Sequence, residues 1–207
     1  MSRHTSITKR PSIRTARLAS WIAIPAAVLI SGLAIGGASY SAFSTTTVNP
    51  ASNWATGTVA LSDDDSNTAA FTATGLKPGS TASKCIAVTS TGTLASAVKL
   101  YGTSPSTTNS LSTYITLTVV QGTGGSFAGG CASFVPLGSG SSLYNGTLAN
   151  FGTSYTSYAN GIGNWAPTGS ASETRVYMLT YTVDSAAPNS TQGGTATIGF
   201  TWETQNS

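Results

Sequence analysis

The pattern that most limits how this chain can fold is the short hydrophobic alternation that runs through it after Ala42. No stretch beyond that residue keeps a helical period for longer than two turns. Apolar and polar residues alternate instead in brief runs. Glycine, proline, asparagine and serine separate one run from the next, as they do at turns between strands. We therefore expect an all-β protein in which residues 51–207 form one β-sandwich domain.

The alternation also locates the strands approximately. Residues 56–61 and 70–74 are predicted to pair as a hairpin across the acidic turn at 63–67. Further strands are predicted around residues 86–88, 98–100, 114–120, 177–183 and 198–202. In the last two, one face is apolar, with Tyr177, Leu179, Tyr181 and Val183 on the first and Ile198, Phe200 and Trp202 on the second. The glycine- and serine-rich stretches 122–142 and 155–174 are predicted to be surface loops.

The first 42 residues have the organisation of a secretory signal peptide. A basic region covers residues 1–17, an uncharged apolar region covers residues 18–37, and small residues follow. We expect this leader to form a helix that contacts the membrane during export and is then removed. A retained anchor is the alternative, because 20 mostly apolar residues just reach across a bilayer. The cut is expected after Ala38 or after Ala42.

Charge is scarce in this chain and unevenly placed. Only 7% of the residues are charged, and five of the bases lie in the first 17 residues. The remainder holds four bases and six acids, which gives 4 − 6 = −2. A body with this balance has no basic patch for phosphate groups, so the sequence excludes nucleic acid as a partner.

The two cysteines, Cys85 and Cys131, both lie beyond the leader. An even number of cysteines in an exported chain favours a disulfide. A bridge between residues 46 positions apart would stabilise the fold by about 4 kcal/mol in the chain-entropy account. Two buried free thiols are the alternative.

Residues with catalytic or metal-binding chemistry are few. The one histidine, His4, lies in the leader, so the body offers none for a triad, a zinc site or a general base. We assign no catalytic, cofactor-binding or metal-binding residue and do not expect an enzyme. The acids at 63–65 could bind calcium, but a solvated hairpin tip is favoured because the spacing is not that of a calcium loop. Three aromatic residues could stack on sugars or pack in the core: Tyr155, Tyr158 and Trp165.

Four short segments occur along the chain in order. They are GGASYSAFS at 36–44, ATGTVAL at 55–61, LKPGS at 76–80 with VTSTGTL at 88–94, and QGG at 192–194 with FTWETQ at 200–205. Together they span most of the chain, although residues 102–174 have no matching motif. In this order they resemble the TasA/camelysin family of exported bacterial proteins, and the low charge and cysteine pair resemble an actinobacterial-type branch. Proteins of this family build extracellular and biofilm-matrix fibres.

The resemblance implies a jelly-roll-like sandwich, secretion to the cell surface, and a dedicated signal peptidase that cuts after Ala42. The mature chain would then begin at Phe43 and polymerise with copies of itself. In the family, the mature N-terminal segment is donated as a strand to the neighbouring subunit. Here the donor would end before Pro50 and would consist of Phe43, Ser44, Thr45, Thr46, Thr47, Val48 and Asn49.

The residues of this segment fit that role on physical grounds. Residues 43–49 are uncharged, rich in β-forming threonine and free of glycine. Such a strand could satisfy the unpaired backbone groups of an open sheet edge. A disordered tail, or pairing within the same subunit, is the alternative. Two other functions are also considered: a monomeric adhesin or glycan-binding module, and a camelysin-like metallopeptidase, which the lack of histidine in the body disfavours.

Overall fold

The computed structural model describes residues 56–206. The chain divides into two compact units, Met1–Ala55 and Thr56–Ser207, and only the second is described below. The expected leader at 1–42, the cleavage site between Ala42 and Phe43, and the donor segment at 43–50 lie outside the described residues. Their assignments stay predictions.

The second unit consists of two antiparallel sheets. The large sheet has the strand order β1-β2-β8-β4-β5, with β6 also paired to β4, and the small sheet has the order β7-β3-β9. In the large sheet the strands are β1 (Leu61–Asp63), β2 (Thr81–Ser90), β4 (Ile115–Thr123), β5 (Val135–Pro136), β6 (Ser142–Thr147) and β8 (Glu173–Val183). In the small sheet they are β3 (Ser96–Thr107), β7 (Ile162–Trp165) and β9 (Ala196–Asn206).

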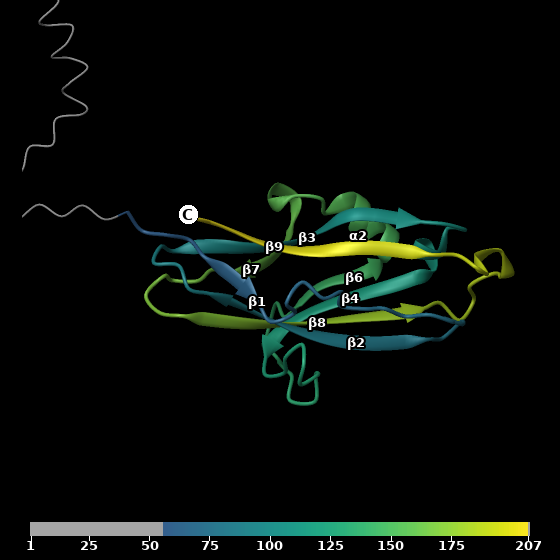
Figure 1. Ribbon diagram of the computed structural model, residues 1–207, viewed down its shortest axis with the longest axis horizontal. Helices are drawn as coiled ribbons and strands as arrows, with labels where there is room; N and C mark the ends of the chain where they lie inside the picture. Colours follow the sequence, from purple (N-terminus) through teal and green to yellow (C-terminus); the bar gives the residue numbers. More distant parts are fainter. Residues whose placement is uncertain (1–55, 207) are drawn as a thin grey trace, which may run out of the picture. The chain divides into compact units, whose positions relative to one another are not determined.

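The chain crosses between the sheets after β2, β3, β6, β7 and β8, so strands distant in sequence become neighbours (Figure 1). β2 lies beside β8, β8 lies beside β4, and β3 pairs with β9. This arrangement is a jelly-roll-like β-sandwich, and it confirms the fold class that the alternation predicted.

Alternate residues of the long strands form the core between the sheets. The large sheet contributes side chains that are at most 1% exposed, namely Ile86, Val88, Leu117, Val119, Tyr177 and Leu179. β3 supplies Val98 and Leu100 from the other side. Ile198, Phe200 and Trp202 of β9 are only partly buried against this core. The apolar faces predicted for 177–183 and 198–202 therefore both face the core.

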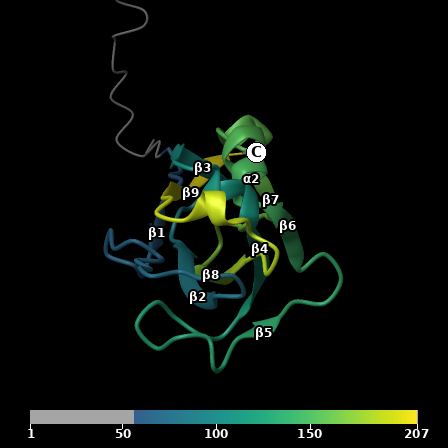
Figure 2. The same ribbon diagram turned by 90° about the vertical axis from the view of Figure 1, so that its right-hand side faces the viewer.

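The two long sides of the sandwich are closed differently (Figure 2). β6, β7 and the helix α2 (Leu148–Ser154) bridge one side. Thr147 caps this helix by accepting a hydrogen bond from the Asn150 N–H at 3.1 Å, and Phe151 anchors it as a fully buried residue. β1 and the irregular chain after it lie on the other side, next to β9. No helix among residues 56–206 has the length and apolar character needed to cross a membrane.

Two strand predictions near the start of the unit are wrong. Residues 56–60 run beside the turn after β2, where the N–H groups of Thr93 and Leu94 both donate to the Thr58 carbonyl, so no regular ladder forms. Residues 70–74 are irregular although their sequence alternates, because no neighbouring strand pairs with them. The two predicted loops contain the short strands β5 and β7, which no alternation in the sequence predicted.

Candidate functional site

β9 is an edge strand, and among residues 56–206 it pairs only with β3. The Gly102 N–H in β3 donates to the Tyr155 carbonyl at 2.8 Å, so the backbone of Gly102 points away from β9. Its partner in the ladder is Phe200. In an antiparallel pair, the polar groups of two opposite residues point either toward each other or away from each other. The N–H and C=O groups of Phe200, and of Ile198 and Trp202 by alternation, therefore face the open side of the strand.

Hydrogen bonds at the other end of the β3–β9 ladder also show that Ile198 faces the open side of β9. The Thr195 carbonyl accepts from the Thr108 N–H at 2.9 Å, and the Thr195 N–H donates to the Thr108 hydroxyl at 2.8 Å. Thr195 thus faces β3, and Ile198, three residues later, faces away. The open side of β9 therefore presents a row of backbone donors and acceptors that could bind another strand.

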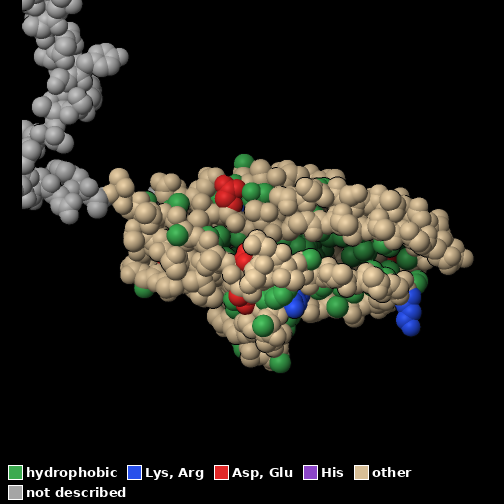
Figure 3. Space-filling view, in the orientation of Figure 1, with side chains coloured by type: hydrophobic (Ala, Val, Ile, Leu, Met, Phe, Trp, Pro, Cys, Tyr) green, Lys and Arg blue, Asp and Glu red, His purple; other side chains and the backbone are tan. Residues whose placement is uncertain are grey.

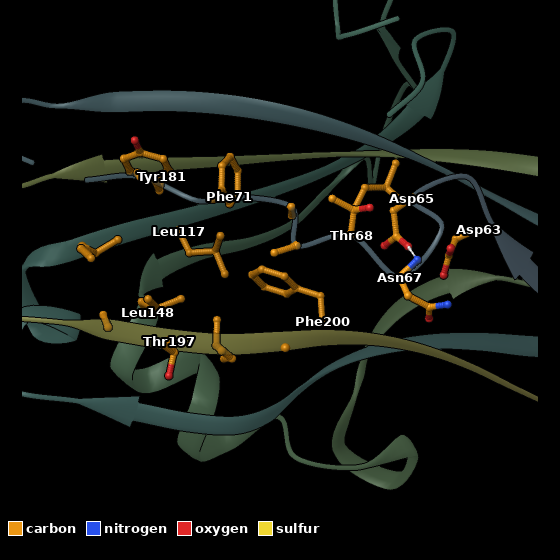
Figure 4. Close-up of a pocket in the computed structure, with 18 of the residues that line it drawn as sticks. Asp63, Asp65, Asn67, Thr68, Phe71, Leu117, Leu148, Tyr181, Thr197 and Phe200 are labelled. Carbon is orange, nitrogen blue, oxygen red and sulfur yellow. Dashed lines mark hydrogen bonds between the residues drawn. The ribbon is translucent and has the colours of Figure 1, made fainter. Parts of the chain in front are cut away.

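A groove of about 560 Å³ lies along this open side. Figure 3 shows apolar side chains at the bottom of a furrow that runs lengthwise between two ridges. β9 lines the groove with residues between Ala196 and Trp202, a stretch of seven residues. Ile86, Leu117 and Tyr181 of the large sheet also line the groove. Figure 4 shows Leu117 and Tyr181 on the side of the groove away from β9. The groove thus opens onto the core on the side where β9 has no paired strand in the described part of the chain.

The wall opposite β9 is an irregular segment, residues 69–76. Several of its side chains line the groove, and no hydrogen bond joins its backbone to any other residue within 56–206. Phe71 holds the segment against the large sheet by an edge-on contact with Tyr181, whose ring centroid is 5.1 Å away at 90°. Leu76 packs with Leu111 and Val183 in a second apolar cluster. Side-chain contacts hold this wall in place without a backbone ladder.

One end of the groove is acidic. Asp63 and Asp65 line the groove, and Figure 4 places them with Asn67 beyond Phe200, away from Thr197. The Asp65 carboxylate accepts from the Asn67 N–H at 2.8 Å. Burial, together with the neighbouring Asp65 carboxylate, raises the pKa of Asp63. The negative charge of the lining is therefore concentrated toward the C-terminal end of β9.

Trp202 adds a polar group to the apolar lining. Its ring packs against Tyr177 with the centroids 5.4 Å apart, and its indole nitrogen is buried without a hydrogen-bond partner among the described residues. A buried donor of this kind destabilises the structure by about 1–3 kcal/mol until an acceptor reaches it.

The acidic cluster is not simply a solvated tip, as its sequence had suggested. Asp64 accepts from the Ala87 N–H at 2.8 Å with one carboxylate oxygen and from the Phe127 N–H at 2.7 Å with the other. It thereby joins the chain after β1 to the edge of β2 and to the loop after β4. Sequence reasoning missed this role, because nothing in a run of three aspartates shows which one faces the protein.

Within 56–206, no three side chains of His, Cys, Asp or Glu gather closely enough to hold a metal ion. The glutamates Glu173 and Glu203 are held separately. Hydrogen bonds from Thr168 lower the pKa of Glu173, and hydrogen bonds from Gln205 and then Tyr101 lower that of Glu203. Both carboxylates serve as local acceptors.

The predicted disulfide is present. Cys85 and Cys131 are bonded, with their Cα atoms 5.3 Å apart. The bridge fixes the loop after β4 to β2, and the same loop brings the Phe127 ring to 3.8 Å from the Lys84 ammonium group. The fully buried Cys85 therefore has a structural role.

The three aromatic residues considered for sugar stacking are turned inward. Trp165 is 3% exposed, Tyr155 packs edge-on against Tyr144 at 5.6 Å, and the Tyr158 hydroxyl donates to the Ala97 carbonyl at 3.1 Å. Core packing and loop anchoring, the other reading of these residues, account for all three.

Comparison of the chain with protein-family models and curated proteins identifies no family. No protein-family model matches the chain, and no curated protein matches it. The groove beside β9 is therefore the feature from which a function can be argued.

Proposed function

We propose that this protein is a structural subunit of extracellular filaments, in which each subunit donates its N-terminal segment to the open edge of β9 in the next. The observation that carries the proposal is the edge of β9, which has no partner strand among residues 56–206 and lies beside an apolar groove. The sequence resemblance to the TasA/camelysin family supports it. The proposal includes export, cleavage by a signal peptidase after Ala42, and assembly at the cell surface.

The donor and the groove agree in length and chemistry. The donor at 43–49 has seven residues, and the stretch of β9 along the groove, from Ala196 to Trp202, also spans seven positions. An added strand would satisfy the outward N–H and C=O groups of β9, each bond contributing about 1 kcal/mol net. Apolar contact with the groove floor would add to this, since hydrogen bonds alone give an isolated strand little net stability.

Charge complementarity gives the donor a direction. Residues 43–49 contain no charged side chain, so cleavage after Ala42 would leave the α-amino group of Phe43 as the donor's one charge. That group is positive below about pH 8. It is best placed near Asp63 and Asp65, at the C-terminal end of β9. The donor would then run antiparallel to β9.

The strand period selects which donor side chains enter the groove. Phe43 and Val48 are five positions apart, so they face opposite sides of a regular strand. Phe43 is the larger apolar residue, and in the antiparallel direction it lies nearest Trp202. We place Phe43, Thr45 and Thr47 toward the core and Val48 toward solvent.

A peptide binding experiment tests the proposal directly. A synthetic peptide of residues 43–49 with a free amino terminus is titrated into protein that begins at Pro50, and binding is followed by calorimetry. We expect saturable binding of one peptide per subunit. A peptide with Thr45→Pro, which loses a donor facing β9, serves as the matched control and should bind much more weakly. Folded protein that binds neither peptide would contradict the proposal.

A further inference from the structure

We propose that residues 69–76 become a β-strand when the groove is filled, pairing with the incoming donor on the side opposite β9. This inference rests on the proposed function and extends it, because it names a second partner for the same donor strand. The filled groove would then hold the donor in the middle of a sheet and not at its edge.

The position of the segment supports this pairing. β9 forms one wall of the groove and residues 69–76 form the other, so an extended chain between them has a backbone on each side. The open side of β9 offers unpaired donors and acceptors, and the backbone of 69–76 has no hydrogen bond to another described residue. Both walls therefore have bonding groups that a strand placed between them could satisfy.

The sequence of the segment is that of a strand without a neighbour. Its central residues, AFTAT at 70–74, alternate and include the strand formers phenylalanine and threonine. The alternation predicted a strand here, and the structure shows irregular chain. Isolated strands are unstable in water, so a β-forming segment stays irregular until a partner arrives. The donor at 43–49 would be that partner.

The two ends of the segment are already fixed. Before it, the Thr68 N–H donates to the Asp65 carbonyl at 3.0 Å. After it, the Ser80 N–H donates to the Lys77 carbonyl at 2.9 Å, and the Gly79 N–H donates to the Val183 carbonyl at 3.0 Å. Anchored ends leave only the short stretch between them to be ordered, which limits the conformational entropy lost on pairing.

Amide hydrogen exchange tests the inference. Two samples are compared: filaments of the protein that begins at Phe43, and subunits of the protein that begins at Pro50. Exchange is followed in peptides that cover residues 69–76. We expect rapid exchange in the subunits and slowing by roughly 100-fold in the filaments, as new backbone hydrogen bonds form. The loop at 125–134 should exchange alike in both.

The outcomes separate the two proposals. Filaments in which 69–76 exchange as fast as in the subunit would overturn this inference and leave the filament role standing. A Phe43 protein that stays monomeric across pH and concentration would overturn both. Slowed exchange at 69–76 in filaments would support both.

A proline pair gives a second test. Successive N–H groups of a strand point to opposite sides, so either Thr72→Pro or Ala73→Pro removes a bond to the donor. We expect one of them to raise the critical concentration for filament assembly about tenfold. Neither should lower the stability of the subunit much, because these N–H groups have no hydrogen-bond partner among residues 56–206. Ala132→Pro, at the second position of the turn closed by Phe134 N–H and the Cys131 carbonyl, is the control. Two variants that polymerise like the parent would overturn the inference.

Discussion

Individual side chains hold the surroundings of the groove in place by bonding segments that lie apart in the sequence. Asp64 is the clearest case, since its two oxygens accept from Ala87 and Phe127 on different segments. Trp202 differs, because its indole N–H lacks an acceptor among the described residues. The first side chain joins separate segments of the subunit, and the second leaves a buried donor without a partner among the described residues.

Removing the Asp64 carboxylate should destabilise the subunit. Asp64→Ala leaves two backbone N–H groups without their charged acceptor, and we expect the free energy of unfolding to fall by about 2 kcal/mol. Thermal or urea unfolding of the Pro50 protein measures this. Asp184→Ala is the matched control, because within 56–206 that carboxylate bonds only to the nearby Ala186 N–H. Equal losses in the two variants would contradict the role given to Asp64.

Asp63 should affect stability and polymerisation in opposite directions. Its folded-state pKa is raised, so the folded state favours the neutral carboxyl, and that contribution is lost as the pH rises through the folded-state pKa. Asp63→Asn should therefore raise the unfolding temperature at pH 7 and give no gain at pH 3. The same variant should weaken polymerisation at pH 7 roughly twofold by removing a partner of the Phe43 amino group. Asp184→Asn should leave polymerisation unchanged, and equal effects would count against the antiparallel donor.

The two apolar residues of the donor should contribute unequally. Phe43→Ala removes the side chain placed in the groove, and we expect a loss of about 2 kcal/mol, or a roughly 30-fold rise in critical concentration. Val48→Ala should change it little, because that residue faces solvent in the same strand. Sedimentation of filaments from the purified mature variants measures both. A larger effect at Val48 would show that the strand enters in the other register.

Among the elements, β9 decides what the sandwich can bind, because one of its sides lacks a partner in the described part of the chain. Natural sheets usually protect such an edge with charge, proline or a cover. The part of β9 that lines the groove has no charged residue and no proline. An edge left open in this way fits a strand that is completed by another subunit.

Two substitutions at one position of β9 distinguish the contribution of its backbone edge to polymerisation from that of its side chain in the core. Ile198→Pro and Ile198→Ala both remove the side chain, but only the proline also removes the N–H that faces the groove. Because that N–H makes no bond to β3, both subunits should fold with similar unfolding temperatures. We expect filaments from Ile198→Ala at a higher critical concentration and none from Ile198→Pro. Electron microscopy checks this, and equal polymerisation would place the interface elsewhere.

The elements also show how far the sequence alone could lead. Strands with their own apolar face, such as β8 and β9, were predictable because the pattern that buries them is local. β5 and β7 are short and exist through their pairing with β4 and β3, so no local pattern marks them. The groove could not be predicted either, since it depends on which strand ends the small sheet.

At the scale of the whole molecule, the proposed filament needs two parts of one chain: the open edge of β9 and the donor segment at 43–49. The donor was proposed from the sequence, and the acceptor edge from the fold. The Cys85–Cys131 bridge and the core of the two sheets give the subunit its own stability. In the proposed function, a subunit that folds alone and keeps the edge of β9 open would be exported first and assembled afterwards.

The most direct measurement is electron microscopy of two purified proteins, one beginning at Phe43 and the other at Pro50. They differ only in the seven residues of the proposed donor. The account predicts filaments from the first and dispersed subunits from the second. Filaments from both would contradict strand donation, and filaments from neither would contradict the structural role itself.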